Sequence, residues 1–334
     1  MSDLRARVSR AMVFLRARVV AFKRSRLGAR SFQVVRVLFV LAVLAWLGYR
    51  LSSIGWQEVW VSRPRTPWFY VTWVGLYLQL PLVEALIFRS VWGLPIRESL
   101  LPLLHKRTLN QDVVSGLGEA SFFMWVRRDG SLSDGEIAGT LKDNLIASSL
   151  ASWTSIVLLF LLTGPLLLTT LLADSGPLYV VGGGLLTILV IVLGMHFRRR
   201  ILTLEPRTVL TVTLVHFGRF VLFVYLLQVI QWWVVEPDAP LRLWAAMLVV
   251  ATVVSRVPFI PAKDLVGIGA ILGVLVLPEA FEATIAAMLL MRTVLDKVTN
   301  LVVAVIHFAL DRGSRSPASL PADDAMTTRS RATP

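Results

Sequence analysis

Charged residues placed between apolar segments of lipid-crossing length are the residues of this chain best able to do chemistry. A charge inside hydrocarbon is costly, so it is retained where it pairs, binds an ion or lines a path. Arginine binds phosphate through a planar fork of donors. Acidic neighbours can balance such cations while no anion is bound. One set of three cations, two acids and a proline therefore indicates recognition of an anionic head group: Arg256, Pro261, Lys263, Asp264, Arg292 and Asp296.

Arg292 has the most apolar surroundings of this set, because apolar residues precede it over several helical turns. Asp296 follows four residues later, on the same face of a helix, and is a candidate partner for it. Such a pair could serve a substrate or only hold the helix in place, and the sequence leaves both open. The same alternatives apply to Arg256, Lys263 and Asp264, which are either site residues or loop residues at the membrane interface.

A second polar group lies within residues 89–143 and contains Gly116, Gly118 and Glu119. Two glycines before a carboxylate allow a tight turn, which could aim Glu119 and several backbone N–H groups into one cavity. Apolar residues flank the turn on both sides, so this stretch is expected to dip into the membrane as a broken element. Arg127 is a candidate phosphate ligand. The alternative is an ordinary cytoplasmic loop with a solvated Glu119.

Other chemistry is poorly supported by the sequence. The four histidines are scattered and form no HExxH-type motif: His105, His196, His216 and His307. The chain has no cysteine, which excludes thiolate metal sites and thiol nucleophiles. It also has no DxD or DxxD acidic pair for Mg²⁺. We predict no metal, no cofactor and no catalytic residue.

Composition indicates which elements must position these residues. The chain has 334 residues, of which 56% are hydrophobic and 16% charged, and its mean hydropathy is +0.70. These values are typical of a polytopic membrane protein and leave no room for a large soluble domain. Apolar runs predict spans at 34–51, 67–88, 144–172, 177–197, 209–235, 241–254 and 283–310.

The segment 265–277 is too short for an ordinary span. It is bounded by prolines and contains three glycines. Its length corresponds to roughly 20 Å of helix, against a hydrocarbon core of about 30 Å. We therefore predict a broken or re-entrant helix, which survives at membrane depth only where protein or a water-filled cavity covers it. The expected fold is an all-α membrane bundle of seven to eight spans.

Charge patterning predicts orientation and the domain limits. The formal net charge is +13, and basic residues crowd the first 36 positions, where Asp3 is the only acid. We predict a basic amphipathic cytoplasmic segment at 1–33 that lies on an anionic membrane surface, a transmembrane domain at 34–310 and a disordered tail at 311–334. A mitochondrial transit peptide is the alternative for the first segment. Nucleic acid is not an expected partner, and the expected location is the cell inner (plasma) membrane.

Four short motifs occur in a recognisable order over residues 34–310: Ile54-Gly55-Trp56, Gly116-Leu117-Gly118-Glu119, Pro258-Phe259-Ile260-Pro261 and Leu290-Met291-Arg292. In this order the chain resembles the transmembrane family of lysylphosphatidylglycerol synthetase/flippase domains and their stand-alone relatives. The resemblance implies a helical membrane domain that moves lipids or lipid-linked head groups between leaflets, with no nucleotide or metal site. The chain departs from the family pattern at Ser115 and at 262–264. We expect no aminoacyl-transferase domain after residue 310.

The sequence therefore predicts a non-enzymatic membrane protein that binds a lipid or a lipid-linked head group and assists its transbilayer movement. One alternative is a membrane-embedded transferase acting on a polyprenyl-linked or glycerolipid substrate, with Glu119 as base beside Arg127 and Arg128. Another is a scaffold that recruits partners through its Arg-rich N-terminus. Association into a homo-oligomer stays open.

Overall fold

The computed structural model describes residues 55–113, 116–128, 130–171, 202–256, 263–275 and 279–313, with scattered positions between 38 and 53. Throughout these residues the chain forms helices and connecting turns, without a strand, as the sequence predicts. Several predictions fall outside the described residues. They concern the segment 1–33, most of the span 34–51, the span 177–197, Pro261 and nearly all of the tail 311–334.

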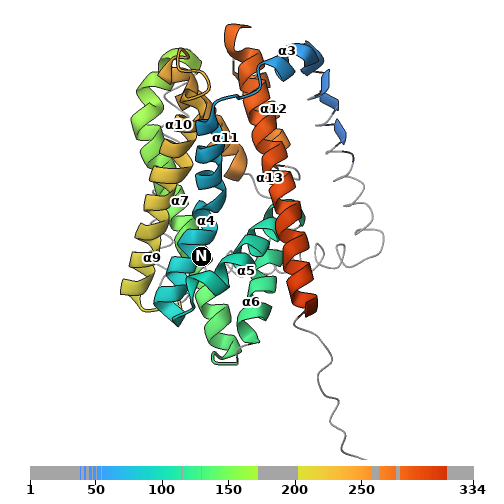
Figure 1. Ribbon diagram of the computed structural model, residues 1–334. Helices are drawn as coiled ribbons and strands as arrows, with labels where there is room; N and C mark the ends of the chain where they lie inside the picture. Colours follow the sequence, from blue (N-terminus) through green and yellow to red (C-terminus); the bar gives the residue numbers. More distant parts are fainter. Residues whose placement is uncertain are drawn as a thin grey trace, which may run out of the picture. The chain divides into compact units, whose positions relative to one another are not determined.

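The described helices are shown in Figure 1. They are α3 (Trp56–Val61), α4 (Pro67–Trp92), α5 (Ile96–Thr108), η1 (Leu109–Val113), α6 (Leu117–Arg127), α7 (Asp134–Leu171), α9 (Pro206–Arg219), η2 (Phe220–Leu227), α10 (Gln228–Trp233), α11 (Leu241–Arg256), α12 (Lys263–Val274) and α13 (Glu279–Gly313). The elements η1 and η2 are π-helices. Segments of this kind are rare, occur mostly within α-helices and are frequent at functional sites.

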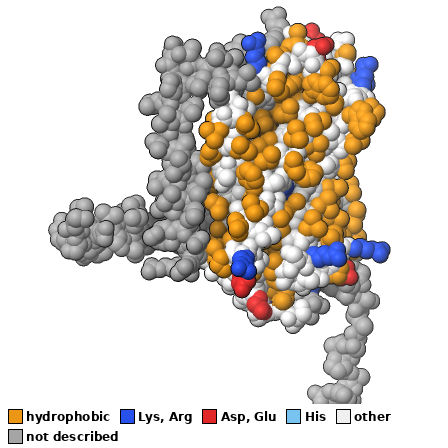
Figure 2. Space-filling model, turned by 90° about the vertical axis from the view of Figure 1, so that its left-hand side faces the viewer, with side chains coloured by type: hydrophobic (Ala, Val, Ile, Leu, Met, Phe, Trp, Pro, Cys, Tyr) orange, Lys and Arg blue, Asp and Glu red, His pale blue; other side chains and the backbone are white. Residues whose placement is uncertain are grey.

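Four helical segments among the described residues are long and apolar enough to cross a membrane: Pro67–Trp92, Asp134–Thr163, Pro206–Trp233 and Ala280–Leu310. The third of these joins α9, η2 and α10. Hydrophobic side chains cover much of the face of the molecule that Figure 2 shows, and few charged side chains are in view there. The protein is thus a helical membrane protein.

The short helix predicted at 265–277 is α12, which ends three residues earlier than expected. Its twelve residues correspond to about 18 Å, well short of a span. Two of its glycines are required by packing, because a Cβ at Gly269 or Gly273 would lie 2.8 Å from the ring of Trp46. The glycines of α12 therefore admit a tryptophan ring against the helix.

Local sequence also explains where the helices begin. Before α7, Ser133 and Glu136 form a capping box: the Ser133 N–H donates to the Glu136 carboxylate at 2.9 Å, and the Glu136 N–H donates to the Ser133 hydroxyl at 3.3 Å. Pro67 and Pro206 are the first residues of α4 and α9, where a proline has no N–H to leave unpaired.

The chain folds into two compact units. The larger unit comprises residues 1–79 and 143–294, and the smaller unit comprises 80–142 and 295–334. In the larger unit α11 packs against α10 and α12, and Trp232, Trp244 and Met247 are fully buried. In the smaller unit α5 packs against η1 and α6, with Phe88, Leu103 and Phe122 in the core.

Candidate functional site

A buried cluster of three charges joins α4, α5 and α6 in the smaller unit. Lys106 is only 3% exposed, and its ammonium lies 2.5 Å from the carboxylate of Glu84 and 3.7 Å from that of Glu119. Glu84 is also buried, and the Glu119 side chain is 18% exposed. A buried charge is tolerated when it is paired and hydrogen-bonded. The ammonium of Lys106 is therefore shared by two carboxylates, one from α4 and one from α6.

The turn before Glu119 has the tight geometry that the sequence predicts. Gly116 has a φ of 97°, which a residue with a side chain rarely adopts. A Cβ on Gly118 would lie 2.1 Å from the carbonyl oxygen of Lys106. Both glycines are therefore required, Gly116 by its backbone angle and Gly118 by the close approach of α5.

The N–H groups of this turn are bound within the protein. The amide oxygen of Asn110, in η1, accepts from the Gly116 N–H at 3.0 Å and from the Gly118 N–H at 2.9 Å. The amide nitrogen of Asn110 donates to Glu119 at 3.0 Å. The two glycine N–H groups that were expected to line a cavity thus fix Asn110, which in turn orients Glu119.

Residues 89–143 are not the irregular loop considered from the sequence. They form the end of α4, α5, η1, α6 and the start of α7, because apolar residues recur at helical spacing and bury against one another. Glu119 is mostly buried and bonded to Asn110. The alternative of a solvated Glu119 in an ordinary loop is therefore wrong.

A second polar network ties α13 to α5 and η1 within the smaller unit. Asp296 lies 3.9 Å from the guanidinium of Arg107. Asp112 accepts from Lys297 at 2.5 Å and from Asn300 at 2.7 Å. The contact of Asp296 with Arg107 was not indicated by the sequence, since the two residues are far apart along the chain. Pairing of Asp296 with Arg292 stays a prediction.

Arg127 takes part in a surface ion pair. Its guanidinium lies 3.0 Å from Asp134, and both side chains are 57% exposed. Exposed pairs of this kind contribute roughly 0–1 kcal/mol. The neighbouring Arg128, at the end of α6, lines a pocket together with residues of α5 and α13.

In the larger unit, Arg292 donates to the amide oxygen of Gln228. Gln228 donates to Gln231 at 3.1 Å, and Gln231 donates to the backbone carbonyl of Phe69 at 3.2 Å. This chain of amides leads from α13 through α10 to α4. The arginine thus lies in a span and donates to a neutral amide.

Arg219 has the same kind of partner in the same unit. It is buried, and it donates to the amide oxygen of Gln79 at 2.9 Å. His216, one turn earlier, lies 3.0 Å from Asn144 of α7. Two arginines of the membrane-crossing helices therefore each donate to a glutamine amide of a neighbouring helix.

The remaining candidates lie at the end of α11 and the start of α12. Arg256 is the last residue of α11 and Lys263 the first of α12, while their side chains and Pro261 lie outside the described part of the chain. Asp264 is half-buried in the first turn of α12. Arg256, Lys263, Asp264 and Arg292 thus belong to the larger unit. The smaller unit contains the others: Gly116, Gly118, Glu119, Arg127 and Asp296.

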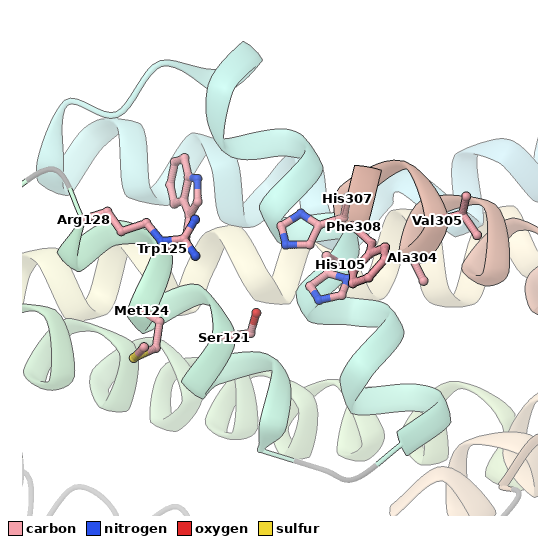
Figure 3. Close-up of a pocket in the computed structure, with 9 residues that line it drawn as sticks. All are labelled: His105, Ser121, Met124, Trp125, Arg128, Ala304, Val305, His307 and Phe308. Atoms are coloured by element: carbon pink, nitrogen blue, oxygen red, sulfur yellow. The ribbon is translucent and has the colours of Figure 1, made fainter. Parts of the chain in front are cut away.

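The smaller unit also contains a pocket of about 630 Å³ that sequence reasoning missed. Nine residues of α5, α6 and α13 line it, among them His105, Ser121, Trp125, Arg128, His307 and Phe308 (Figure 3). The pocket brings two histidines together from distant parts of the chain. No local pattern could have indicated this, because each histidine is isolated in its own segment.

The two histidines stack face to face. The centroids of the His105 and His307 rings are 3.9 Å apart and the ring planes differ by 15°. Within the described residues the buried Nδ1 of His105 has no hydrogen-bond partner. Burial, and next the proximity of His307, lower the pKa of His105 below its usual value of 6.5. His105 is therefore held largely uncharged at neutral pH.

Comparisons of the chain with protein-family models, curated protein sequences and solved structures find no match. Functional assignment therefore depends on the residues and geometry above.

Proposed function

We propose that this protein binds a lipid or a lipid-linked head group in the membrane and assists its movement between leaflets, without catalysing a reaction. The observation that carries the proposal is the buried cluster of Glu84, Lys106 and Glu119. Ionisable groups are retained in membrane domains mainly where they lie on a substrate or ion path. The cluster includes α4, which is long and apolar enough to span a membrane.

The cluster has the features of a site that exchanges partners. A head group that enters hydrocarbon loses hydration, which fixed charges and dipoles must replace. Lys106 contacts Glu84 closely at 2.5 Å, whereas Glu119 is farther at 3.7 Å and more exposed. Glu119 is thus the carboxylate that a phosphate oxygen can displace from Lys106. Movement down a gradient and coupling to ions through Glu119 or Asp264 are both compatible with this arrangement.

Cations in the larger unit support the same class of substrate. Arg219 and Arg292 lie in membrane-crossing helices and donate to glutamine amides. A guanidinium presents a planar fork of donors that matches a phosphate, so either arginine suits an anionic group better than a cationic one. The motif order shared with lysylphosphatidylglycerol synthetase/flippase domains favours lipid as the cargo.

The proposed architecture has seven to eight spans in the cell inner (plasma) membrane and a cytoplasmic N-terminus. The basic residues of 1–33 contact the anionic leaflet, in keeping with the positive-inside rule.

The test is a lipid-movement assay with purified protein in liposomes. Fluorescent lipids with different head groups are added, and a membrane-impermeant quencher reports the fraction in the outer leaflet. We expect accelerated movement with wild-type protein and a loss of about tenfold or more, equivalent to about 1.4 kcal/mol, in Glu119→Gln and Arg292→Gln. Arg97→Gln is the matched control, since Arg97 is an exposed arginine of α5.

Retention of full activity in both variants would contradict the proposal. If no lipid moves faster, but a covalently altered lipid forms when donor extracts are added, the protein is instead a transferase with Glu119 as its base. Folding of each variant is checked by size-exclusion chromatography and circular dichroism.

A further inference from the structure

The histidine pocket of the smaller unit has a basic end. Of the nine described residues that line it, three are basic and none is acidic. His105 comes from α5, Arg128 from the end of α6 and His307 from α13, so the three elements that form the pocket each direct one basic group toward it. Figure 3 also shows the Ser121 side chain pointing toward the side of the pocket where the histidines lie. Converging donors without an acid favour an anionic ligand.

The other walls of the pocket are apolar and reach the surface. Met124, Val305 and Phe308 line it and are each more than half exposed. Val305 and Phe308 continue a row of exposed apolar residues at helical spacing along α13: Val298, Leu301, Val305 and Phe308. The row belongs to a helix that can cross a membrane, so it suits contact with acyl chains. A ligand that fits both parts has an anionic head and an apolar tail.

The size of the pocket agrees with such a head group. About 630 Å³ lies within the range of roughly 300–1,000 Å³ that is typical of small-molecule sites. A complete lipid is too large for this volume. The head group is therefore enclosed, while the acyl chains lie outside along α13.

We propose that the pocket formed by His105, His307 and Arg128 binds the phosphodiester head group of a lipid, whose acyl chains lie against Val305 and Phe308. Arg128 supplies a permanent positive charge, and Trp125 supplies a flat apolar wall. The stacked histidines supply ring N–H donors. This site names the substrate class for the function proposed above, on which it rests.

Binding at this site takes up protons. In the unliganded protein burial and the stacked His307 ring lower the pKa of His105. A bound anion favours the charged imidazolium, so affinity rises as pH falls through the histidine range. The charged and titratable groups lining the pocket are His105, His307 and Arg128, and no acid among the nine lining residues opposes this sign.

The experiment measures binding of dioctanoyl phosphatidylmethanol to the full-length protein in detergent micelles by calorimetry. This probe is a phosphodiester without a second acidic proton, so its own charge is the same at about pH 5.5 and about pH 7.5, on either side of the usual histidine pKa. We expect about tenfold tighter binding at the lower pH, with proton uptake revealed by two buffers of different ionisation enthalpy. Dioctanoylglycerol, which lacks the phosphate, is expected not to bind.

Three variants test the assignment of residues. His105→Gln and His307→Gln should each reduce the pH dependence and the proton uptake, whereas Arg128→Gln should weaken binding at both pH values. Arg97→Gln is the matched control and should bind as wild type does. Each histidine is changed singly, so that failure of one variant to fold leaves the other as a test. Equal pH dependence in wild type and in a folded histidine variant overturns the proposal.

Dimethyl phosphate separates a lipid site from a site for free phosphodiesters. Weak binding of this tailless probe supports the lipid, and binding as tight as that of the lipid probe overturns it. The lipid-movement assay distinguishes the two levels of inference. Binding that depends on the pocket without any lipid movement leaves the site standing and refutes the transport function. Movement that is unaffected by pocket variants, with no binding at the pocket, refutes the site and leaves the function standing.

Discussion

Replacement of Lys106 by methionine is expected to be the most destabilising single change in the smaller unit. Methionine has a similar length and fits the same space, so the main effect is loss of the charge. Glu84 and Glu119 would then lose the ammonium that they share at 2.5 and 3.7 Å. Lys106 and Glu84 are no more than 5% exposed, so water cannot replace that ammonium. Removing one partner of a buried ion pair costs about 3–5 kcal/mol.

The two carboxylates should not contribute equally to this cost. Glu84 is buried and in close contact with Lys106, whereas Glu119 is 18% exposed and keeps its hydrogen bond from Asn110. We therefore expect Glu84→Gln to be more destabilising than Glu119→Gln. In the Lys106→Met background, Glu84→Gln should restore a substantial part of the stability, because it removes the carboxylate left without its cation.

Reversible unfolding in mixed detergent micelles, followed by circular dichroism, measures these differences. Lys142→Met is the matched control, since Lys142 is an exposed lysine of the same unit and should change stability by no more than about 0.5 kcal/mol. A cost of less than about 1 kcal/mol for Lys106→Met, or no recovery in the double variant, would refute a buried, shared ammonium.

Two further changes test the turn and the histidine pair. Gly118→Ala places a Cβ 2.1 Å from the Lys106 carbonyl oxygen and should destabilise the protein by about 1–3 kcal/mol or more. Gly135→Ala is the control, because open space surrounds the new Cβ and stability should not change. Equal unfolding midpoints for the two variants would show that α5 and α6 do not meet at Gly118. The pKa of His105 is lowered by burial and by His307, so the unfolded chain binds the proton more readily than the folded protein. The free energy of unfolding should therefore decrease as pH falls below about 6.5, and His105→Gln should make this pH dependence weaker. An unchanged pH dependence in this variant would exclude His105 as its source.

The sequence alone determined the class of protein and some of its local geometry. Long apolar runs can be stable only as helices in a membrane, because their backbone groups must bond within the segment. Prolines and their spacing determined that α12 would be short. The two glycines before Glu119 predicted a tight turn, because the positive φ of Gly116 and the close approach at Gly118 exclude side chains.

Only the tertiary structure decided which partners the polar side chains have. Periodicity shows which face of a helix is polar, but it does not show which neighbouring helix meets that face. The pairing of Lys106 with Glu84, the contact of Arg107 with Asp296 and the occupation of the glycine N–H groups by Asn110 all depend on how helices pack. The stacking of His105 on His307 depends on it most, since α5 and α13 are separated by most of the chain. Burial of apolar faces positions the helices, and that placement determines which polar side chains meet.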